Sequence, residues 1–468
     1  MGRLPKDTAS CIRIVFDYLL NSEILDHIVS LTRDLITNPR DYNGQRKIDG
    51  EFSLDHLKLW IAGELVMSIC PQPSIEDYWR VDHSYYGCKW IQDRVSRDLF
   101  TFITSVITFD VLSLIQQVRT NFQAHWMPVD YAVIDEMIVP FQGRSQHRVH
   151  IRGKPWSDGL KLFGMADKRS SLWSFFLYQG SASERATTTR AIVEDFVNEL
   201  PPKPYLIIGD AYYGSLDLAI ALHNNNNRFI LGCGKNRPAR YFSDLLHPQL
   251  KGQSKGSCVY ASQYECQAVS IKDNTIVNFL TNTSSTATIM ATQTRKDKTS
   301  ASQQIVAILQ AYRERLGRVD NVDGSLAQFM YPHRATKWTL ALLRGVIRLC
   351  LHNTWVIVRS RSDDNLSIRL VIEEVIDHLA SNIGLRLRSA SLLPTPARSR
   401  HKYDISPIKS ACLICSSSEL VDPKRTFGIC VACNVHIHKK CFAHHVVNSW
   451  FVVNYWVFNC IFLDLILW

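Results

Sequence analysis

Two short apolar runs that carry carboxylates constrain the fold of this chain more than any other feature of its sequence. The run YAVIDEMIVPF (131–141) contains Asp135 and Glu136, and the run PYLIIGD (204–210) ends on Asp210. A short continuous apolar run is typical of a strand that is buried on both faces. Strand-like segments (160–180) lie between the two runs, and helical patterns follow (187–200, 215–225). Strands that lead into strand–helix alternation predict an α/β core.

Helical periodicity dominates on either side of this core. Apolar residues recur at helical spacing in 11–37, in 53–70, where Ser53 can cap the helix, near 91–119 and again in 306–360. Residues 238–305 are rich in Ser, Thr, Asn, Lys and Gln, and they predict a small β-rich insertion. A chain of 468 residues is too long for one ordinary core, so we expect two to four domains.

Three aspartates, Asp135, Asp210 and Asp320, form a candidate metal site, and Asp323 lies near the third in the sequence. Asp135 lies inside a strand, and Asp210 ends one, which is a common place for an active-site carboxylate in α/β sheets. Asp320 and Asp323 stand three residues apart, so on a helix they share a face. Each alone is typical of a structural carboxylate, but converging carboxylates repel one another and hold hard cations such as Mg²⁺. Two such ions about 3.5–4 Å apart can clamp the attacking and leaving oxygens of a phosphodiester.

A cysteine cluster near the C-terminus predicts a zinc module. Five of the thirteen cysteines fall within 412–441, as two C-x2-C pairs followed by His-x2-Cys. This clustering indicates metal binding in a reducing compartment. The ligands suffice for two tetrahedral, structural zinc ions. The first ligands that we assign are Cys412, Cys415, Cys430, Cys433, His438 and Cys441. His436, His444 and His445 compete for the final ligand positions, and His444 is included in the expected set.

Charge favours a polyanionic partner. The formal net charge is +10, from 53 Lys plus Arg against 43 Asp plus Glu, and such an excess is typical of proteins that bind nucleic acid. Residues 389–410 have the composition of a linker. Basic residues lie in and beside this segment: Arg386, Arg388, Arg398, Arg400 and Lys402. One interpretation is a solvated linker. The other is a functional segment that contacts phosphates or directs nuclear import.

The two ends of the chain differ in character. The first ten residues, MGRLPKDTAS, lack the apolar run of a signal peptide. The last twenty, 449–468, are apolar and long enough for a membrane span. A membrane anchor, a buried helix or strand, and sequence from outside the original reading frame are the three interpretations. We favour the third, because the tail follows a complete zinc-like module, and we do not expect a membrane partner.

The carboxylate blocks resemble those of piggyBac-type DDE transposases. The three blocks that carry the aspartates are IDEMIVPFQGR (134–144), GDAYYGSLDLAIAL (209–222) and YRERLGRVDNVDGSLAQF (312–329). Further segments are similar to the blocks around them: LDHLKLWIAGELVMSICPQPSIEDYW (54–79), IRGKPWSDGLKLFGMAD (151–167), KWTLALL (337–343) and HNTW (352–355). The resemblance covers most of residues 15–446 in the same order.

The resemblance implies a fold and a reaction. It implies an α/β, RNase H-like catalytic core with a β-rich insertion, a mostly helical dimerisation and DNA-binding domain, and a C-terminal Cys-rich module that contacts the transposon end through zinc. Asp135, Asp210 and Asp320 map onto the catalytic triad that binds two Mg²⁺ or Mn²⁺, and Asp323 maps onto an accessory acid. The implied activity is cut-and-paste transposition into TTAA targets by a nuclear homodimer that binds double-stranded DNA.

The resemblance also gives domain boundaries. The expected segments are a helical domain (1–128, completed by 331–388), a catalytic core (129–237, completed by 308–330), an insertion (238–307), a basic linker (389–410), a zinc module (411–446) and an apolar tail of unclear status (447–468).

Some positions depart from the family pattern. Ala211 replaces the usual Asn, Arg318 replaces a Gly, and 157–159 replace a Trp-Gly pair. None of these removes an expected metal ligand, although such neighbours tune metal sites. The alternatives to an active transposase are a truncated or decayed copy that only binds DNA, and an unrelated RNase H-like nuclease that would not need zinc.

Overall fold

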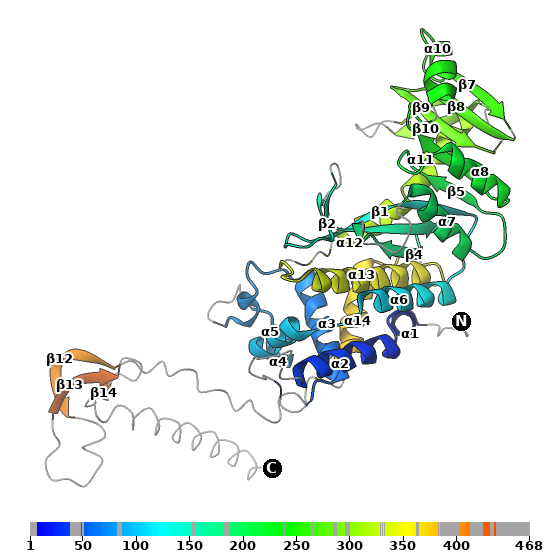
Figure 1. Cartoon of the computed structure of the whole chain (residues 1–468). Coiled ribbons are helices and arrows are strands. Elements are labelled where there is room, and N and C mark those ends of the chain that lie inside the picture. Colours follow the sequence, from blue (N-terminus) through cyan, green and yellow to red (C-terminus); the bar gives the residue numbers. More distant parts are fainter. Residues whose placement is uncertain are drawn as a thin grey trace. The chain divides into compact units, whose positions relative to one another are not determined.

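The structure is a computed structural model of the chain, in two compact units, Met1–Leu387 and Arg388–Trp468 (Figure 1). The described residues are 7–37, Ile48, 51–81, 87–151, 156–180, 188–237, 239–263, 265–283, 288–294, 300–327, Phe329, Tyr331, 333–361, 365–381, Ile383, 403–411, 425–430 and 435–436.

The first unit opens with helices, as the periodicity predicts. They are α1 (Thr8–Leu19), α2 (Ser22–Thr37), α3 (Leu54–Ile69), the 3₁₀ turn η1 (Glu76–Trp79), α4 (Lys89–Arg94), α5 (Arg97–Val106) and α6 (Val111–His125).

Two of the expected helices are divided in the structure. The pattern over 11–37 belongs to both α1 and α2, because Asn21 accepts a hydrogen bond from the Ile24 amide (3.1 Å) and caps a new helix. The stretch near 91–119 spans α4, α5 and α6. Ser96 caps α5 and Asp110 caps α6 in the same way. The helical patterns over 11–37 and near 91–119 are therefore confirmed as helical, and polar caps divide each stretch into more than one helix.

A mixed sheet follows, which confirms the predicted α/β class. Its strands are β1 (Tyr131–Pro140), β2 (Arg148–His150), β3 (Asp158–Asp167), β4 (Leu172–Leu177), β5 (Leu206–Gly209), β6 (Arg228–Cys233), β7 (Cys258–Gln263), β8 (Cys266–Lys272) and β9 (Ile276–Thr281). Their order is β2-β3-β1-β5-β6-β9-β8-β7, and β4 pairs with β3. Only β1–β5 and β5–β6 are parallel among these described pairs. Helices α7 (Thr189–Glu199) and α8 (Leu216–Asn224) lie between strands in the chain.

The segment expected as an insertion continues the central sheet. Strand β9 pairs antiparallel with β6, and β8 and β7 extend the sheet beyond it. Short helical turns precede β7, namely α9 (Ala239–Tyr241), η3 (Phe242–Leu246) and α10 (His247–Gln249), and the hairpin of β10 (Thr288–Thr294) and β11 (Ser300–Val306) follows β9. The proposed boundaries at 238 and 307 remain predictions about domains.

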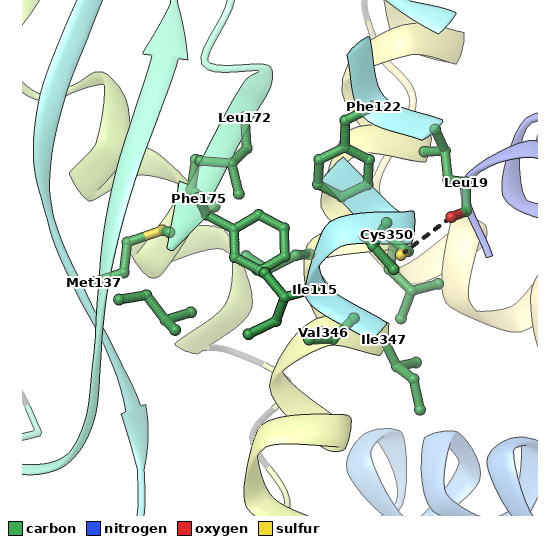
Figure 2. Packing of buried hydrophobic residues seen from close by; sticks show 14 of the residues in the cluster. Leu19, Ile115, Phe122, Met137, Leu172, Phe175, Val346, Ile347 and Cys350 are labelled. Atoms are coloured by element: carbon green, nitrogen blue, oxygen red, sulfur yellow. Dashed lines mark hydrogen bonds between the residues drawn. The ribbon is translucent and has the colours of Figure 1, made fainter. Parts of the chain in front are cut away.

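Four further helices complete the first unit: α11 (Ala307–Leu316), α12 (Arg318–Ala327), α13 (Trp338–Arg359) and α14 (Ile368–Ala380). Helix α13 is buried almost throughout its length and lies beside α6 beneath the sheet (Figure 1). Figure 2 shows the apolar cluster in which Val346, Ile347 and Cys350 of α13 meet side chains of both the helices and the sheet. This cluster fixes the helical part against β1 and β4.

Burial also explains why α13 is so apolar. Among the described residues it is the one single helix with the length and hydropathy to cross a membrane, and the bent pair α5–α6 passes that test only as a pair. In α13, 94% of the relevant window is buried inside the protein.

The second unit contains a small antiparallel sheet of β12 (Tyr403–Ala411), β13 (Arg425–Cys430) and β14 (Val435–His436). The predicted zinc ligands Cys430 and His436 lie on paired strands, in the register Cys430 opposite Val435 and Ile429 opposite His436. The other predicted zinc ligands and the apolar tail (447–468) lie outside the described residues: Cys412, Cys415, Cys433, His438, Cys441, His444 and His445.

Candidate active site

The parallel pairing of β1 and β5 brings the first two aspartates to neighbouring positions. The last pair in this register is Ile134 opposite Gly209, so Asp135 on β1 and Asp210, directly after β5, are the next residues along the two segments. Asp135 is 7% exposed, and its Oδ1 accepts a hydrogen bond from the Glu136 amide (2.7 Å). Asp210 is half-buried, and its Oδ1 accepts one from the Tyr212 amide (2.9 Å).

The third aspartate lies on a helix that packs against β1. Asp320 is in the first turn of α12 and is exposed, and Asp323 is half-buried one turn later. Alternation along β1 places Asp135 on the same face as Val139. Helix α13 covers that face, since a Cβ on Gly345 would lie 2.7 Å from Val139 Cγ2. Asp320 and Asp323 line a cavity of about 470 Å³, together with the second half of β1 and α13, whereas Asp135 and Asp210 lie outside its lining.

Glu136 points to the opposite face of β1 and has a different environment. Its Oε1 forms an ion pair with Nζ of the buried Lys161 (3.1 Å) on β3. The same ammonium lies 4.5 Å from the ring centre of Phe163 and 4.6 Å from that of Tyr212. Sequence reasoning missed Lys161. The signal was available, because period-two alternation separates Glu136 from Asp135 and leaves a half-buried acid that a cation stabilises.

Two glycines allow the loop that carries Asp210 to lie against β6. A Cβ on Gly214 would be 1.8 Å from the Gly232 carbonyl oxygen. A Cβ on Gly232 would be 2.8 Å from the Tyr312 hydroxyl and 3.0 Å from the Ala211 nitrogen. The Asp210 backbone is therefore confined between β6 and α11.

The pKa values of two tyrosines reflect the negative charge of the nearby carboxylates. Burial raises the pKa of the Tyr312 phenol, and the charges of Asp210 and Asp135 raise it further. Burial likewise raises the pKa of Tyr213, with added contributions from Glu136, Asp135 and Asp210. Both phenols therefore remain protonated at neutral pH, and a cation placed near Asp135 and Asp210 would be stabilised.

The departure at Arg318 has a structural role. Its Nε donates to the Tyr131 hydroxyl (3.0 Å), and its Nη2 donates to the Glu314 carbonyl (3.1 Å). The side chain thus ties the junction of α11 and α12 to the start of β1, two residues before Asp320.

The donor set fits hard cations in chemical type. Asp135, Asp210 and Asp320 offer only carboxylate oxygens, the ligands that Mg²⁺ and Mn²⁺ prefer. Within the part of the chain that the structure describes, however, no three His, Cys, Asp or Glu side chains are gathered closely enough to hold a metal ion. The structure therefore brings Asp135, within β1, beside Asp210, which follows β5, and places Asp320 on a helix that packs against β1, without assembling a metal-ligand cluster.

Comparison with known proteins gives three matches. The model of a family described as Transposase IS4 matches residues 13–355. The human PiggyBac transposable element-derived protein 2 is 23% identical over 353 residues, which are 69% of this chain and 59% of that protein. The chain thus spans about 59% of the length of this relative. A cryo-EM structure of a piggyBac transposase synaptic complex with hairpin DNA has a similar fold, with a TM-score of 0.69, 18% identity and 84% of each chain covered.

Proposed function

The chain belongs to the Transposase IS4 family, as a piggyBac-type member, and from this premise we propose that it is a DNA transposase that cuts and joins DNA by metal-dependent phosphoryl transfer. The observation that carries the proposal is the register of β1 and β5, in which Asp135 lies beside Asp210. Helix α12, which bears Asp320, packs against β1. Two carboxylates on neighbouring strand segments and a third on a helix are suited to holding metal ions that position the DNA phosphate and neutralise its charge.

In the proposed reaction the protein orients DNA and makes no covalent bond to it. Water attacks a phosphodiester at the transposon end and releases a 3′-hydroxyl. That hydroxyl attacks a phosphodiester of the opposite strand, which closes a hairpin on the transposon end and releases the flanking strand. A second water opens the hairpin and restores the 3′-hydroxyl. This hydroxyl then attacks target DNA at TTAA and displaces a target 3′-hydroxyl. Asp135, Asp210 and Asp320 would hold two Mg²⁺ or Mn²⁺, and when bound these ions supply Lewis-acid activation of the attacking oxygen. Asp323 would act as an accessory acid at the cavity wall.

The proposed partners follow from the same premise. The substrate is double-stranded DNA with terminal inverted repeats, and the solved relative is named as a synaptic complex with hairpin DNA. Two transposon ends must be joined, which favours a homodimer. We further propose that the protein acts in the nucleus. Structural zinc, held by the ligands named above in the second unit, would support contact with the transposon end. The net charge of +10 is consistent with DNA binding.

The test compares strand cleavage with DNA binding. The substrate is duplex DNA that carries the terminal repeats flanking the coding sequence beside TTAA, with Mn²⁺ present. Asp210→Asn and Asp135→Asn should each reduce cleavage by at least about 1,000-fold, because they remove a charge at the reacting centre. DNA binding should change by less than about threefold. The exposed Asp217 on α8 provides the matched control, and Asp217→Asn should cleave normally.

A second function is favoured by one observation. The absence of a gathered metal-ligand group among the described residues suits a DNA-binding protein that derives from a transposase and no longer cleaves. Wild-type protein that binds the repeats but never nicks them with Mn²⁺ would establish this second function and refute the first. Equal loss of cleavage and binding in Asp210→Asn would also refute the catalytic assignment.

A further inference from the structure

A buried histidine connects α13 to the helix that carries Asp320. His352 has no exposed surface. Its Nε2 lies 2.7 Å from the Ser170 carbonyl oxygen, and its Nδ1 lies 2.6 Å from the Ser325 hydroxyl on α12. A carbonyl oxygen can only accept, so Nε2 carries the proton and Nδ1 accepts from Ser325. Burial lowers the pKa of His352 to about 4, and the imidazole is therefore neutral near pH 7 with this arrangement of protons.

The turn that contains Ser170 is held in place by several hydrogen bonds. Ser170 has a left-handed backbone, with φ of 62°. The buried Asp167 holds the turn, since its Oδ1 accepts from the amides of Arg169 (2.9 Å) and Ser171 (3.1 Å). Its Oδ2 accepts from the Trp126 indole (2.9 Å). The turn between β3 and β4 is therefore a fixed platform for α12.

Helix α12 is held at two points, one on this platform and one on α13. The Asn321 amide donates to the Ser170 hydroxyl (3.2 Å), and Ser325 donates to His352. Asn321 and Ser325 are four residues apart and share one face of α12. Two polar contacts separated by one turn set both the rotation and the axial position of a helix, and Asp320 directly precedes the first of them.

The neighbour of His352 secures α13 in turn. Asn353 Oδ1 accepts from the Leu172 amide (2.9 Å), and its Nδ2 donates to the Leu172 carbonyl (2.8 Å). This pair of bonds on β4 prevents α13 from sliding. His352 therefore presents its ring from an immobile position.

We propose that His352 is a positioning residue for the candidate active site: through Ser325 and Ser170 it fixes α12 and thereby the direction of Asp320. The assignment rests on the proposed function for the role of Asp320, whereas the fixing of α12 does not. Groups that orient metal ligands without touching the metal commonly change metal affinity by 10–100-fold, and small misplacements of reacting groups cost large factors in rate.

The experiment measures the position of α12 and the affinity for Mn²⁺ separately. His352→Phe fills the same space but removes both hydrogen bonds, His352→Gln can restore one of them, and Ser325→Ala removes only the partner hydroxyl. The control is His56→Phe, because His56 is another buried histidine, on α3, whose ring bonds to Ser53 and not to α12. Hydrogen exchange of the amides 318–327 reports α12, and electron paramagnetic resonance titration with Mn²⁺ alone reports metal affinity.

We expect His352→Phe and Ser325→Ala to speed exchange in 318–327 by about tenfold and to weaken Mn²⁺ binding by about tenfold. His352→Gln should recover part of both, and His56→Phe should change neither. If His352→Phe does not fold, Ser325→Ala carries the test. Unchanged exchange and affinity in Ser325→Ala, or faster exchange with unchanged affinity, would overturn the proposal.

The two proposals fail in different ways. A wild-type protein that binds no Mn²⁺ contradicts the proposed function, and the exchange rates then decide alone whether His352 fixes α12. Wild-type Mn²⁺ binding that survives in all three variants leaves the proposed function intact and removes His352 from it.

Discussion

At position 232 a single methyl group would meet three atoms that confine Asp210. A Cβ there would lie 2.8 Å from the Tyr312 hydroxyl, 3.0 Å from the Ala211 nitrogen and 3.1 Å from the Asp210 carbonyl carbon. Two of these atoms belong to backbone, which cannot move aside as a flexible side chain does. Gly232→Ala should therefore displace Asp210 and lower DNA cleavage by at least about tenfold, with DNA binding kept.

Gly234 provides the matched control for this change. A Cβ on Gly234 would meet nothing within 4 Å, so Gly234→Ala should cleave DNA as the wild type does. Cleavage of the repeat substrate by both variants, measured beside binding, checks the prediction. Equal cleavage by Gly232→Ala and Gly234→Ala would show that the loop tolerates the displacement.

His352 makes folding stability sensitive to acid. Burial lowers its pKa from 6.5 to about 4, so between these values the unfolded state binds more protons than the folded state. The free energy of unfolding contributed by this group is therefore full above about pH 6.5 and is lost as the pH falls toward 4. The expected loss is about 2 kcal/mol between pH 7.5 and pH 5.

Urea unfolding at the two pH values measures this loss. Burial lowers the pKa of other histidines as well, among them His56 and His333, so the wild type must be compared with His352→Phe. The variant should lose about 2 kcal/mol less on acidification, because it has no imidazole to protonate. An identical pH dependence in the two proteins would contradict a neutral, buried His352.

The candidate aspartates could be found from the sequence, but their supports could not. Asp135 and Asp210 stand out because a carboxylate interrupts or ends an apolar run, and that is a local signal. The contacts of His352 with Ser170 join residues 182 positions apart, and no periodicity reveals such a pair. Arg318 was noticed only as a departure, and its bond to Tyr131 requires the packing of α11 and α12 on β1.

Among the elements, α3 and α13 are joined by a buried ion pair. Arg344 Nε and Nη2 donate to the two carboxylate oxygens of Glu64 at 2.7 and 3.0 Å. Glu64 is 2% exposed and Arg344 is 9% exposed. Burial alone would lower the pKa of Arg344, but Glu64 raises it overall, so the carboxylate offsets the cost of burying the guanidinium charge.

Removing one partner of this pair should be strongly destabilising. Glu64→Ala leaves a buried guanidinium without its carboxylate, and the expected loss of unfolding free energy is about 3–5 kcal/mol in urea. The exposed pair of Lys89 and Asp93 (2.6 Å) is the control, and Asp93→Ala should cost less than about 1 kcal/mol. Similar losses in the two variants would mean that α3 and α13 are held by apolar packing alone.

The elements themselves were predicted unevenly, for physical reasons. Strands β1 and β5 follow directly from their apolar runs, because each is buried on both faces. The divisions between α1 and α2 and within 91–119 depend on single capping residues, which an apolar periodicity does not register. The pairing of β9 with β6 spans about fifty residues of chain, so a compositional change at 238 could not show that the sheet continues through it.

At the scale of the whole molecule, the chain divides after Leu387. The first unit holds the four candidate aspartates, and the second holds every predicted zinc ligand. The sequence indicates this division through the linker composition of 389–410. The later part of this segment is nevertheless a strand, since β12 (Tyr403–Ala411) pairs with β13 in the second unit. The catalytic and zinc predictions therefore concern separate units and can be tested independently.

Cys430→Ser tests the zinc prediction against this division. Cys430 lies on β13 opposite Val435, in the hairpin that also carries His436. If it is a thiolate ligand, its loss should lower the zinc content from about two ions to about one per chain, because a tetrahedral structural site rarely survives on three ligands. Binding to the repeat DNA should weaken, while the thermal unfolding of the first unit and Mn²⁺ binding should stay unchanged, since the candidate Mn²⁺ ligands lie in the first unit.

The control is Cys258→Ser. Cys258 is a half-buried free cysteine on β7 in the first unit, so this variant should keep both zinc ions. Zinc measured by mass spectrometry separates the outcomes: equal zinc in the two variants would refute the ligand set, and a loss of Mn²⁺ binding together with zinc would show that the two units do not act independently.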